Sequence, residues 1–274
     1  MIKTSATLPV QFDTCFSPFH FYEFDTGLEW VKDNGFDGVE LVISKPLEVD
    51  INFLNKKLYK LSLEVSTIAT GQSVALEGIS LTDDSETVRK KAVDRIIEHI
   101  NLSTELVGRP NVTIGLIRGK GDSGSKNILL DIFKKELIKC IDYAARKNIV
   151  LNLEPINRYE TVMLNSCDDT LDFLKMLGSP KNTGILYDTF HSNIEDADML
   201  NALQKIKGNI SHVHFADSNR HLPGKGHIDF KSIYKKLAEI KYDGYVSIET
   251  LNLPDSEDIK KNAGKAMKSI CCNI

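Results

Sequence analysis

Short apolar runs alternate with longer amphipathic segments along almost the whole chain, and this alternation restricts the fold more than any other feature. Most of the runs are apolar at successive positions, as expected of parallel strands that are buried on both faces. We expect eight strands, at Val10–Cys15, Gly38–Ile43, Leu63–Ala69, Val112–Leu116, Ile149–Glu154, Thr183–Asp188, Ile210–Phe215 and Tyr245–Glu249. A strand–helix unit that repeats eight times predicts an α/β fold with a parallel sheet.

The segments between these runs show the periodicity of amphipathic helices. The clearest has Val88, Ala92, Ile96 and Ile100 on one stripe and follows the capping segment 82–85. Further helices are expected around 130–144, 169–176, 197–206, 230–240 and 255–267. We therefore predict a single (β/α)8 TIM barrel domain over residues 1–274, close to the ~250 residues typical of such barrels. The rival, a doubly wound open sheet, usually carries a GxGxxG motif after its first strand, and that motif is absent.

Composition and charge narrow the classes of partner. The chain is 42% hydrophobic and 26% charged, with a net charge of −4 and no basic block, which argues against binding to nucleic acid. No apolar run approaches the ~20 residues of a membrane-spanning helix, and the start of the chain lacks the apolar core of a signal peptide. The five cysteines form no CxxC pair. We expect a cytoplasmic protein with reduced cysteines that binds neither membrane nor nucleic acid.

Four successive strands in the second half of the chain end in a residue able to bind a metal. These residues are Glu154, Asp188, His214 and Glu249, which follow one another at intervals of 34, 26 and 35 residues. Each interval is about one βα unit, and side chains at the carboxyl ends of barrel strands converge on the axis. One such acid alone would more often be a helix cap or a solvated loop residue. Four in a row predict a shared site.

The types of these four residues indicate one divalent cation. Three carboxylates buried close together are costly unless a cation neutralises them. Carboxylates with one imidazole suit Mn²⁺, Mg²⁺ or Co²⁺ better than a thiolate-rich structural zinc site, and no cysteine belongs to the set. We expect Mn²⁺, with Mg²⁺ and Co²⁺ as alternatives.

The sequence around these residues resembles a known family. The segments 153–160 (LEPINRYE), 187–195 (YDTFHSNIE), 212–220 (HVHFADSNR) and 223–226 (PGKG) are similar to the D-tagatose/D-psicose 3-epimerases, which belong to the xylose isomerase-like barrels. The similarity is specific between residues 148 and 250. The first half matches only in general layout, for instance in Gly38-Val39-Glu40 of the second expected strand.

The resemblance implies a function and a role for each site residue. It makes Glu154, Asp188, His214 and Glu249 the metal ligands, and Glu154 with Glu249 the catalytic acid–base pair. Glu160, His191 and Arg220 would bind the sugar substrate. The activity implied is inversion of C3 of a free ketose through a cis-enediolate. The cation stabilises that intermediate as a Lewis acid while one carboxylate removes the proton and the other returns it. Relatives are commonly dimers or tetramers, so we expect a homo-oligomer.

Other activities use the same site, and the sequence does not separate them. An aldose–ketose isomerase, acting on a sugar or sugar phosphate, and a sugar-acid dehydratase both begin with the same activated carbonyl. A DNA-repair endonuclease of the AP-endonuclease type needs a multi-metal cluster with several additional histidine and acidic ligands. The chain has seven histidines, and its first 150 residues contain only His20 and His99. A non-catalytic sugar-binding barrel is disfavoured because both acid–base glutamates are retained.

Four further residues leave the substrate open. Family members often carry Gly-Glu where this chain has Ala216-Asp217. Arg118 and Lys120, after the fourth expected strand, would either meet a phosphate or carboxylate of the substrate or form a solvated basic loop.

We place His212 on the face of its strand opposite to His214 and expect it to pack outside the barrel.

Overall fold

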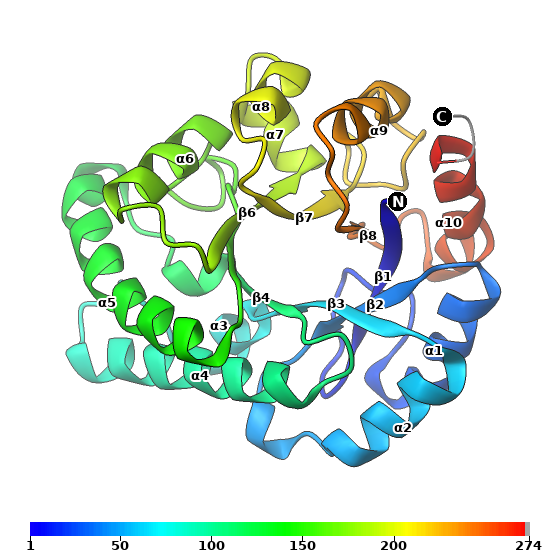
Figure 1. Ribbon diagram of the computed structural model, residues 1–274, viewed down its shortest axis with the longest axis horizontal. Helices are drawn as coiled ribbons and strands as arrows, with labels where there is room; N and C mark the ends of the chain where they lie inside the picture. Colours follow the sequence, from blue (N-terminus) through cyan, green and yellow to red (C-terminus); the bar gives the residue numbers. More distant parts are fainter. Residues whose placement is uncertain (272–274) are drawn as a thin grey trace.

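The computed structural model describes residues 1–271 and shows a closed barrel of eight parallel strands (Figure 1). The strands follow one another around the barrel in chain order, and β8 pairs with β1 to close it. They are β1 (Lys3–Pro9), β2 (Gly38–Val42), β3 (Glu64–Ala69), β4 (Asn111–Ile114), β5 (Leu151–Leu153), β6 (Thr183–Asp188), β7 (Ile210–Phe215) and β8 (Tyr245–Ile248). The predicted TIM barrel is confirmed.

The helices form a ring outside the strands (Figure 1). They are α1 (Phe24–Asp33), α2 (Ile51–Leu61), α3 (Gly71–Glu77), α4 (Glu86–Glu105), α5 (Lys126–Lys147), α6 (Cys167–Met176), α7 (Thr189–Glu195), α8 (Met199–Lys205), α9 (Phe230–Glu239) and α10 (Ser256–Cys271), with short 3₁₀ turns η1 (Phe21–Glu23), η2 (Pro46–Glu48), η3 (Leu116–Arg118) and η4 (Ser123–Ser125). The predicted stripe of α4 faces the core, where Ala92, Ile96 and Ile100 are buried. Of the helices in residues 1–271, none is long and apolar enough to cross a bilayer.

The position predicted for the first strand, Val10–Cys15, is wrong. The strand is β1, Lys3–Pro9, and residues 10–15 form the loop that follows it. The error has a physical cause, because β1 contains polar residues that are fully or almost fully buried. Ser5 and Thr7 are 0% and 3% exposed, and the Thr7 hydroxyl donates to the Ile248 carbonyl at 3.0 Å. A search for continuous apolar runs therefore passes over this strand.

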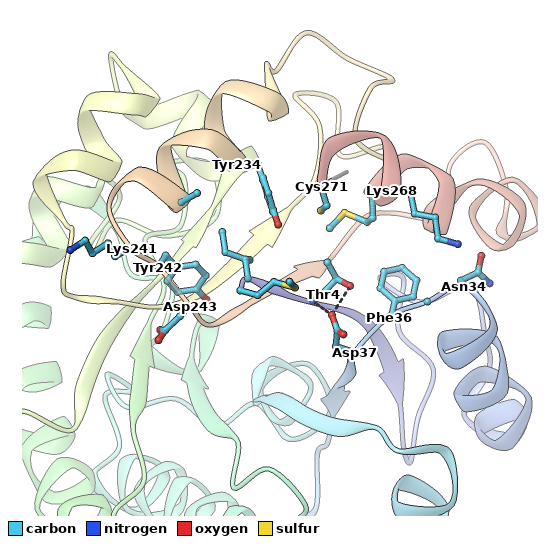
Figure 2. Close-up of a pocket in the computed structure, with 16 residues that line it drawn as sticks. Thr4, Asn34, Phe36, Asp37, Tyr234, Lys241, Tyr242, Asp243, Lys268 and Cys271 are labelled. Atoms are coloured by element: carbon cyan, nitrogen blue, oxygen red, sulfur yellow. Dashed lines mark hydrogen bonds between the residues drawn. The ribbon is translucent and has the colours of Figure 1, made fainter. Parts of the chain in front are cut away.

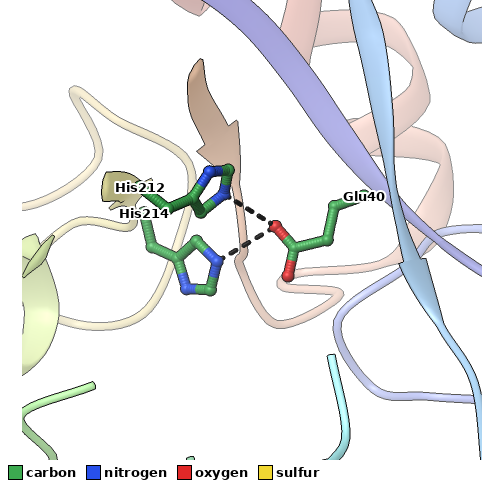
Figure 3. Close-up of side chains that lie close together, drawn as sticks. All are labelled: Glu40, His212 and His214. Carbon is green, nitrogen blue, oxygen red and sulfur yellow. Dashed lines mark hydrogen bonds and ion pairs between the residues drawn. The ribbon is translucent and has the colours of Figure 1, made fainter. Parts of the chain in front are cut away.

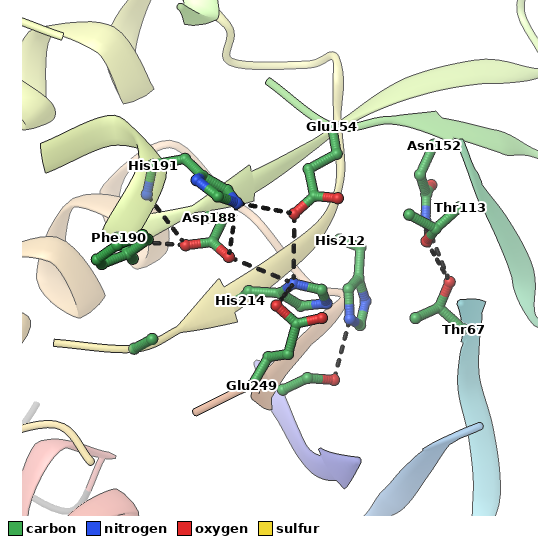
Figure 4. Close-up of polar contacts among 12 residues, drawn as sticks. Thr67, Thr113, Asn152, Glu154, Asp188, Phe190, His191, His212, His214 and Glu249 are labelled. Atoms are coloured by element: carbon green, nitrogen blue, oxygen red, sulfur yellow. Dashed lines mark hydrogen bonds and ion pairs between the residues drawn. The ribbon is translucent and has the colours of Figure 1, made fainter. Parts of the chain in front are cut away.

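Polar side chains also hydrogen-bond to one another across β3, β4 and β5. Thr67 and Thr113 lie 3.1 Å apart through their hydroxyls, and the Asn152 amide donates to Thr67 at 3.2 Å (Figure 4). Ser211 donates to the other end of the Asn152 side chain at 2.6 Å. These buried groups satisfy one another, which is the condition for tolerating polar atoms inside a protein. The large apolar core lies between the strands and the helices.

Candidate active site

The candidate site lies at the carboxyl ends of the strands, in a cavity of about 340 Å³. Glu154 directly follows β5, Asp188 ends β6, His214 is the penultimate residue of β7, and Glu249 directly follows β8. Each ligating atom of these four residues lies within 4.8 Å of the others. The four strand-end side chains thus meet at one point, as their spacing predicts.

A larger cavity, of about 810 Å³, lies at the opposite end of the barrel (Figure 2). It is lined by the start of β1, by Asp37 before β2 and by residues of α9 and α10. Thr4 donates its backbone N–H to the Asp37 carboxylate at 2.8 Å, a contact between the ends of two strands. In barrels of this type chemistry occurs at the carboxyl ends of the strands, so we place the active site in the smaller cavity.

His214 is the centre of the ligand group (Figure 4). Its Nδ1 lies 3.3 Å from Glu249 Oε2, 3.6 Å from Asp188 Oδ2 and 3.8 Å from Glu154 Oε1. This nitrogen is buried and makes no hydrogen bond, although three carboxylates face it. A buried lone nitrogen amid three carboxylates is the arrangement that a hard divalent cation completes.

Asp188 is oriented by the helix that follows it. Its Oδ1 caps α7 by accepting from the backbone N–H groups of Phe190 at 2.7 Å and His191 at 3.3 Å. The other oxygen, Oδ2, is thereby left for the site, where Arg220 donates to it at 2.6 Å. The same capping turn places His191 beside the ligands.

His191 presents one ring nitrogen to the site and is held by the other. The Asn157 amide donates to its Nδ1 at 2.8 Å, so Nε2 carries the proton. Nε2 lies 3.7 Å from Glu154 Oε1 and 3.9 Å from Asp188 Oδ2. Burial lowers the pKa of His191 to about 4, so the ring is a neutral donor at pH 7. The sequence alone did not indicate Asn157, which also donates to Glu160 at 2.8 Å.

Arg220 is fixed by a rigid loop after β7. Asp217 organises this loop by accepting backbone N–H groups of Ser218 at 2.8 Å, Gly224 at 2.8 Å and Ile228 at 3.2 Å. Any side chain at Gly226 would come within 2.3 Å of the Asp217 carboxylate. Asp217, the position where the chain departs from the epimerase pattern, is therefore a loop anchor.

The guanidinium of Arg220 makes cation–π contacts with two aromatic rings. Its central carbon is 5.3 Å from the centroid of Phe16 and 4.8 Å from that of Phe190. Its two terminal nitrogens donate to Asp188 and Glu249. Phe16 comes from the loop after β1 and lines the cavity. No local pattern in the sequence indicates this residue, since its contact with Arg220 spans most of the chain.

Replacement of Phe16 by Ala is expected to weaken substrate binding while preserving metal binding. Loss of one cation–π contact of about 1–2 kcal/mol would let the Arg220 guanidinium move and raise KM about 5- to 30-fold. Steady-state kinetics and a Mn²⁺ titration measure the two effects separately. Phe21→Ala, in an exposed 3₁₀ turn outside this cavity, is the matched control. An unchanged KM in Phe16→Ala would contradict this role.

When no cation is bound, the surroundings of Glu154 and His214 favour the protonated form of each. Burial, and then repulsion by Glu249, raises the pKa of Glu154 to about 8. Burial alone would lower the pKa of His214, but the charges of Glu40 and Glu249 outweigh it and hold that pKa well above its usual value. At neutral pH the metal-free site therefore retains protons that a cation has to displace.

The affinity for Mn²⁺ is accordingly expected to rise with pH. Below pH 8 Glu154 is protonated in the metal-free protein. Its contribution alone therefore makes the affinity fall about tenfold for each unit by which the pH is lowered. The proton on His214 steepens the dependence further. Titration calorimetry in buffers of different ionisation enthalpy counts the protons released on binding. An affinity that is constant between pH 6 and pH 8 would be inconsistent with this assignment.

The expectation that His212 packs outside the barrel is wrong. Residues two apart on a strand point to the same face, so His212 and His214 both point into the barrel. Both Nε2 atoms contact Glu40 Oε2, at 3.2 Å and 3.0 Å respectively (Figure 3). Glu40 and His212 are thus part of the site's surroundings.

Neither Arg118 nor Lys120 lines the cavity. Arg118 is 0% exposed and donates to the backbone carbonyls of Gly115, Met163 and Glu154. It supports the chain that carries Glu154 and is not placed to meet a phosphate. Lys120 is exposed to solvent. Arg158 pairs with Glu195 at 2.8 Å.

Comparison with known proteins agrees with this fold. Residues 28–270 match the model of the xylose isomerase-like TIM barrel family. An L-ribulose 3-epimerase of Mesorhizobium japonicum is 31% identical over 252 residues, which cover 89% of this chain and 80% of that protein. A 3-dehydro-D-guloside 4-epimerase of Escherichia coli is 28% identical over 227 residues, covering 80% of this chain and 84% of that protein. The crystal structure of a Methylomonas sp. D-allulose 3-epimerase in complex with D-allulose is similar to this chain, with a TM-score of 0.84 and 22% sequence identity. The match covers 100% of this chain and 97% of the epimerase chain, and it shows that the two share a fold.

The barrel, the site at its carboxyl end and the epimerases among its relatives define an enzyme of the isomerase class. The chain belongs to the xylose isomerase-like TIM barrel family.

Proposed function

We propose that this protein is a divalent-metal-dependent epimerase that inverts C3 of a free ketose through a cis-enediolate. The observation that carries the proposal is the position of two glutamates in one ligand group. Glu154 and Glu249 come from non-adjacent strands and approach His214 from above and below in Figure 4. Inversion of a carbon requires one group that removes a proton and another that delivers one to the opposite face. The pair of glutamates supplies both.

The residues present suit a cation. The unpartnered His214 Nδ1 and the three carboxylates around it provide four oxygen or nitrogen donors, and Glu154, Asp188, His214 and Glu249 would hold the ion. This donor set favours Mn²⁺, with Mg²⁺ and Co²⁺ as alternatives. When bound, the cation supplies Lewis-acid stabilisation of the negative charge that develops on the substrate oxygens.

The remaining site residues would orient the sugar. His191 offers a neutral N–H beside Glu154, and Glu160 offers a carboxylate at the rim of the same cavity. Arg220 also lines the cavity and contacts the rings of Phe16 and Phe190 and the carboxylate of Glu249. Fixed donors and acceptors around a bound sugar hold its C3 between the two glutamates.

The charge of the cavity supports an unphosphorylated substrate. Within the described part of the chain, Arg220 is the only lysine or arginine that lines it, and its guanidinium is already engaged by Asp188 and Glu249. Asp13 and Glu160 add negative charge to the wall. A phosphate group would find no free cation there. The same lack of basic residues disfavours a DNA substrate.

Product analysis on a panel of sugars tests the proposal. The metal-stripped protein, supplied with Mn²⁺, is incubated with free ketoses, their phosphates, aldoses and sugar acids, and the products are separated by chromatography. We expect C3 epimers of a free ketose, and no turnover without a divalent ion. Aldoses formed from ketoses would identify an isomerase, and loss of water would identify a dehydratase.

Two further expectations accompany the proposed activity. We propose that the enzyme acts in the cytoplasm, which the reduced side chains of Cys15, Cys140 and Cys167 support. Cys272 lies outside the described residues. A homo-oligomer, dimer or tetramer, remains a prediction, which light scattering of the purified protein tests.

A further inference from the structure

Glu40 lies at the centre of β2, on the far side of the barrel from β7. Its side chain is fully buried, and one oxygen, Oε2, contacts the Nε2 atoms of both His214 and His212 (Figure 3). The His212 Nε2 also lies 3.0 Å from the Ser247 hydroxyl, two residues before Glu249 on β8. Glu40 thus connects β2 to β7, and His212 extends the contact to β8.

The contact with Glu40 determines which nitrogen of His214 can bind a cation. An ionised carboxylate only accepts hydrogen bonds, so a nitrogen 3.0 Å from Glu40 Oε2 is the one that carries the proton. In the neutral ring, the form that can bind a cation, the lone pair is therefore on the other nitrogen, Nδ1. That nitrogen is the buried atom without a hydrogen bond that faces the three carboxylates.

Glu40, His212 and His214 are also close enough to bind a metal of their own. The separations of 3.0 Å and 3.2 Å between Oε2 and the two Nε2 atoms are, however, those of N–H···O hydrogen bonds. A nitrogen that donates a proton to Glu40 has no lone pair left for a cation. The group is therefore a hydrogen-bonded support.

We propose that Glu40 is a positioning residue of the metal centre, which fixes the ring of His214 so that Nδ1 points at the cation. The inference rests on the proposed function, because it presumes that the four strand-end residues bind a metal. Partners of this kind orient a ligating histidine and increase its donor strength, and their loss typically lowers metal affinity about 10- to 100-fold. Glutamine at position 40 keeps the volume but offers an N–H group that favours the wrong ring tautomer.

A double-mutant cycle tests this role through Mn²⁺ dissociation constants measured by electron paramagnetic resonance. Glu40→Gln is expected to weaken binding about 10- to 100-fold in the wild-type background. In a His214→Ala background the same change should alter the constant less than about twofold, because Glu40 acts through that ring. Glu136→Gln removes another buried carboxylate, on α5 outside the barrel, and is expected to leave the affinity unchanged. Equal effects of Glu40→Gln in both backgrounds would overturn the proposal.

A second measurement does not require the variant to fold. A long-range ¹H–¹⁵N spectrum of the wild-type protein, labelled at histidine and loaded with diamagnetic Mg²⁺, reports the protonation of each ring nitrogen. We expect a proton on Nε2 of His214 and none on Nδ1, and the reverse would overturn the inference. If the wild-type protein binds metal and Glu40→Gln binds it equally well, this inference fails while the proposed function stands. If the wild-type protein binds no divalent ion, both fail.

Discussion

Glu154→Gln and Glu249→Gln are each expected to lower the rate of epimerisation by a factor of at least ~10²–10⁴, the usual contribution of general acid–base catalysis. Glutamine keeps the shape of the side chain but can neither take up nor release a proton under these conditions. Both positions are also proposed ligands, so the loss of rate includes weaker metal binding. The measurement is the turnover rate at saturating Mn²⁺, with circular dichroism to confirm folding.

Two controls separate the acid–base role from simple loss of a ligand. Asp188→Asn removes a ligand but keeps both glutamates, so its rate should recover further as Mn²⁺ is raised than that of either glutamine variant. Glu257→Gln changes a glutamate that is 81% exposed and does not line the cavity, and it should behave as wild type. A glutamine variant that keeps more than a tenth of the wild-type rate would show that its glutamate is not part of the pair.

Arg118→Met is expected to cause the largest loss of stability, at least about 2 kcal/mol in the free energy of unfolding. Methionine fills most of the space but leaves the carbonyls of Met163 and Glu154 without their donor, and each unsatisfied buried group costs about 1–3 kcal/mol. The Gly115 carbonyl keeps the backbone N–H of residue 118 at 3.2 Å. Burial lowers the pKa of Arg118 to about 10, so it remains charged at pH 7. Urea denaturation measures the change, and Tm should fall by roughly 2–4 °C for each kcal/mol.

Lys120→Met is the matched control for Arg118→Met, because Lys120 is exposed two residues further along the same loop. A surface change of this kind is expected to alter stability by less than about 0.5 kcal/mol. If Arg118→Met instead left stability unchanged and raised KM for an anionic sugar, Arg118 would be a substrate-binding residue.

The second half of the barrel was predictable from the sequence because its signals are local. Runs such as Thr183–Asp188 and Ile210–Phe215 are apolar enough to stand out, and the structure has β6 and β7 at these residues. A ligating residue at the end of each late strand reflects the repeat of the βα unit, which sequence spacing records directly. The convergence of Glu154 with Glu249 follows from closure of the barrel.

The features that were missed depend on contacts between distant residues. Glu40 and His214 are 174 positions apart, and no pattern along the chain relates a residue of β2 to one of β7. Phe16 reaches Arg220 in the same way. The strand β1 was missed for another reason. Ser5 and Thr7 are buried, but they are polar residues, and polar residues are typical of loops. The error on His212 was avoidable, because residues two apart on a strand point to the same face.

The most direct test of the proposed chemistry is the position at which deuterium enters the sugar. The Mn²⁺-loaded enzyme is incubated in D₂O with the free ketose that it turns over fastest, and the sugars are followed by NMR. We predict that deuterium appears at C3 of the epimer formed, because the proton returned there comes from a carboxyl group that has exchanged with solvent. Deuterium at C1 with formation of an aldose, or inversion at C3 without any deuterium, would contradict the assignment of Glu154 and Glu249 as a C3 proton-transfer pair.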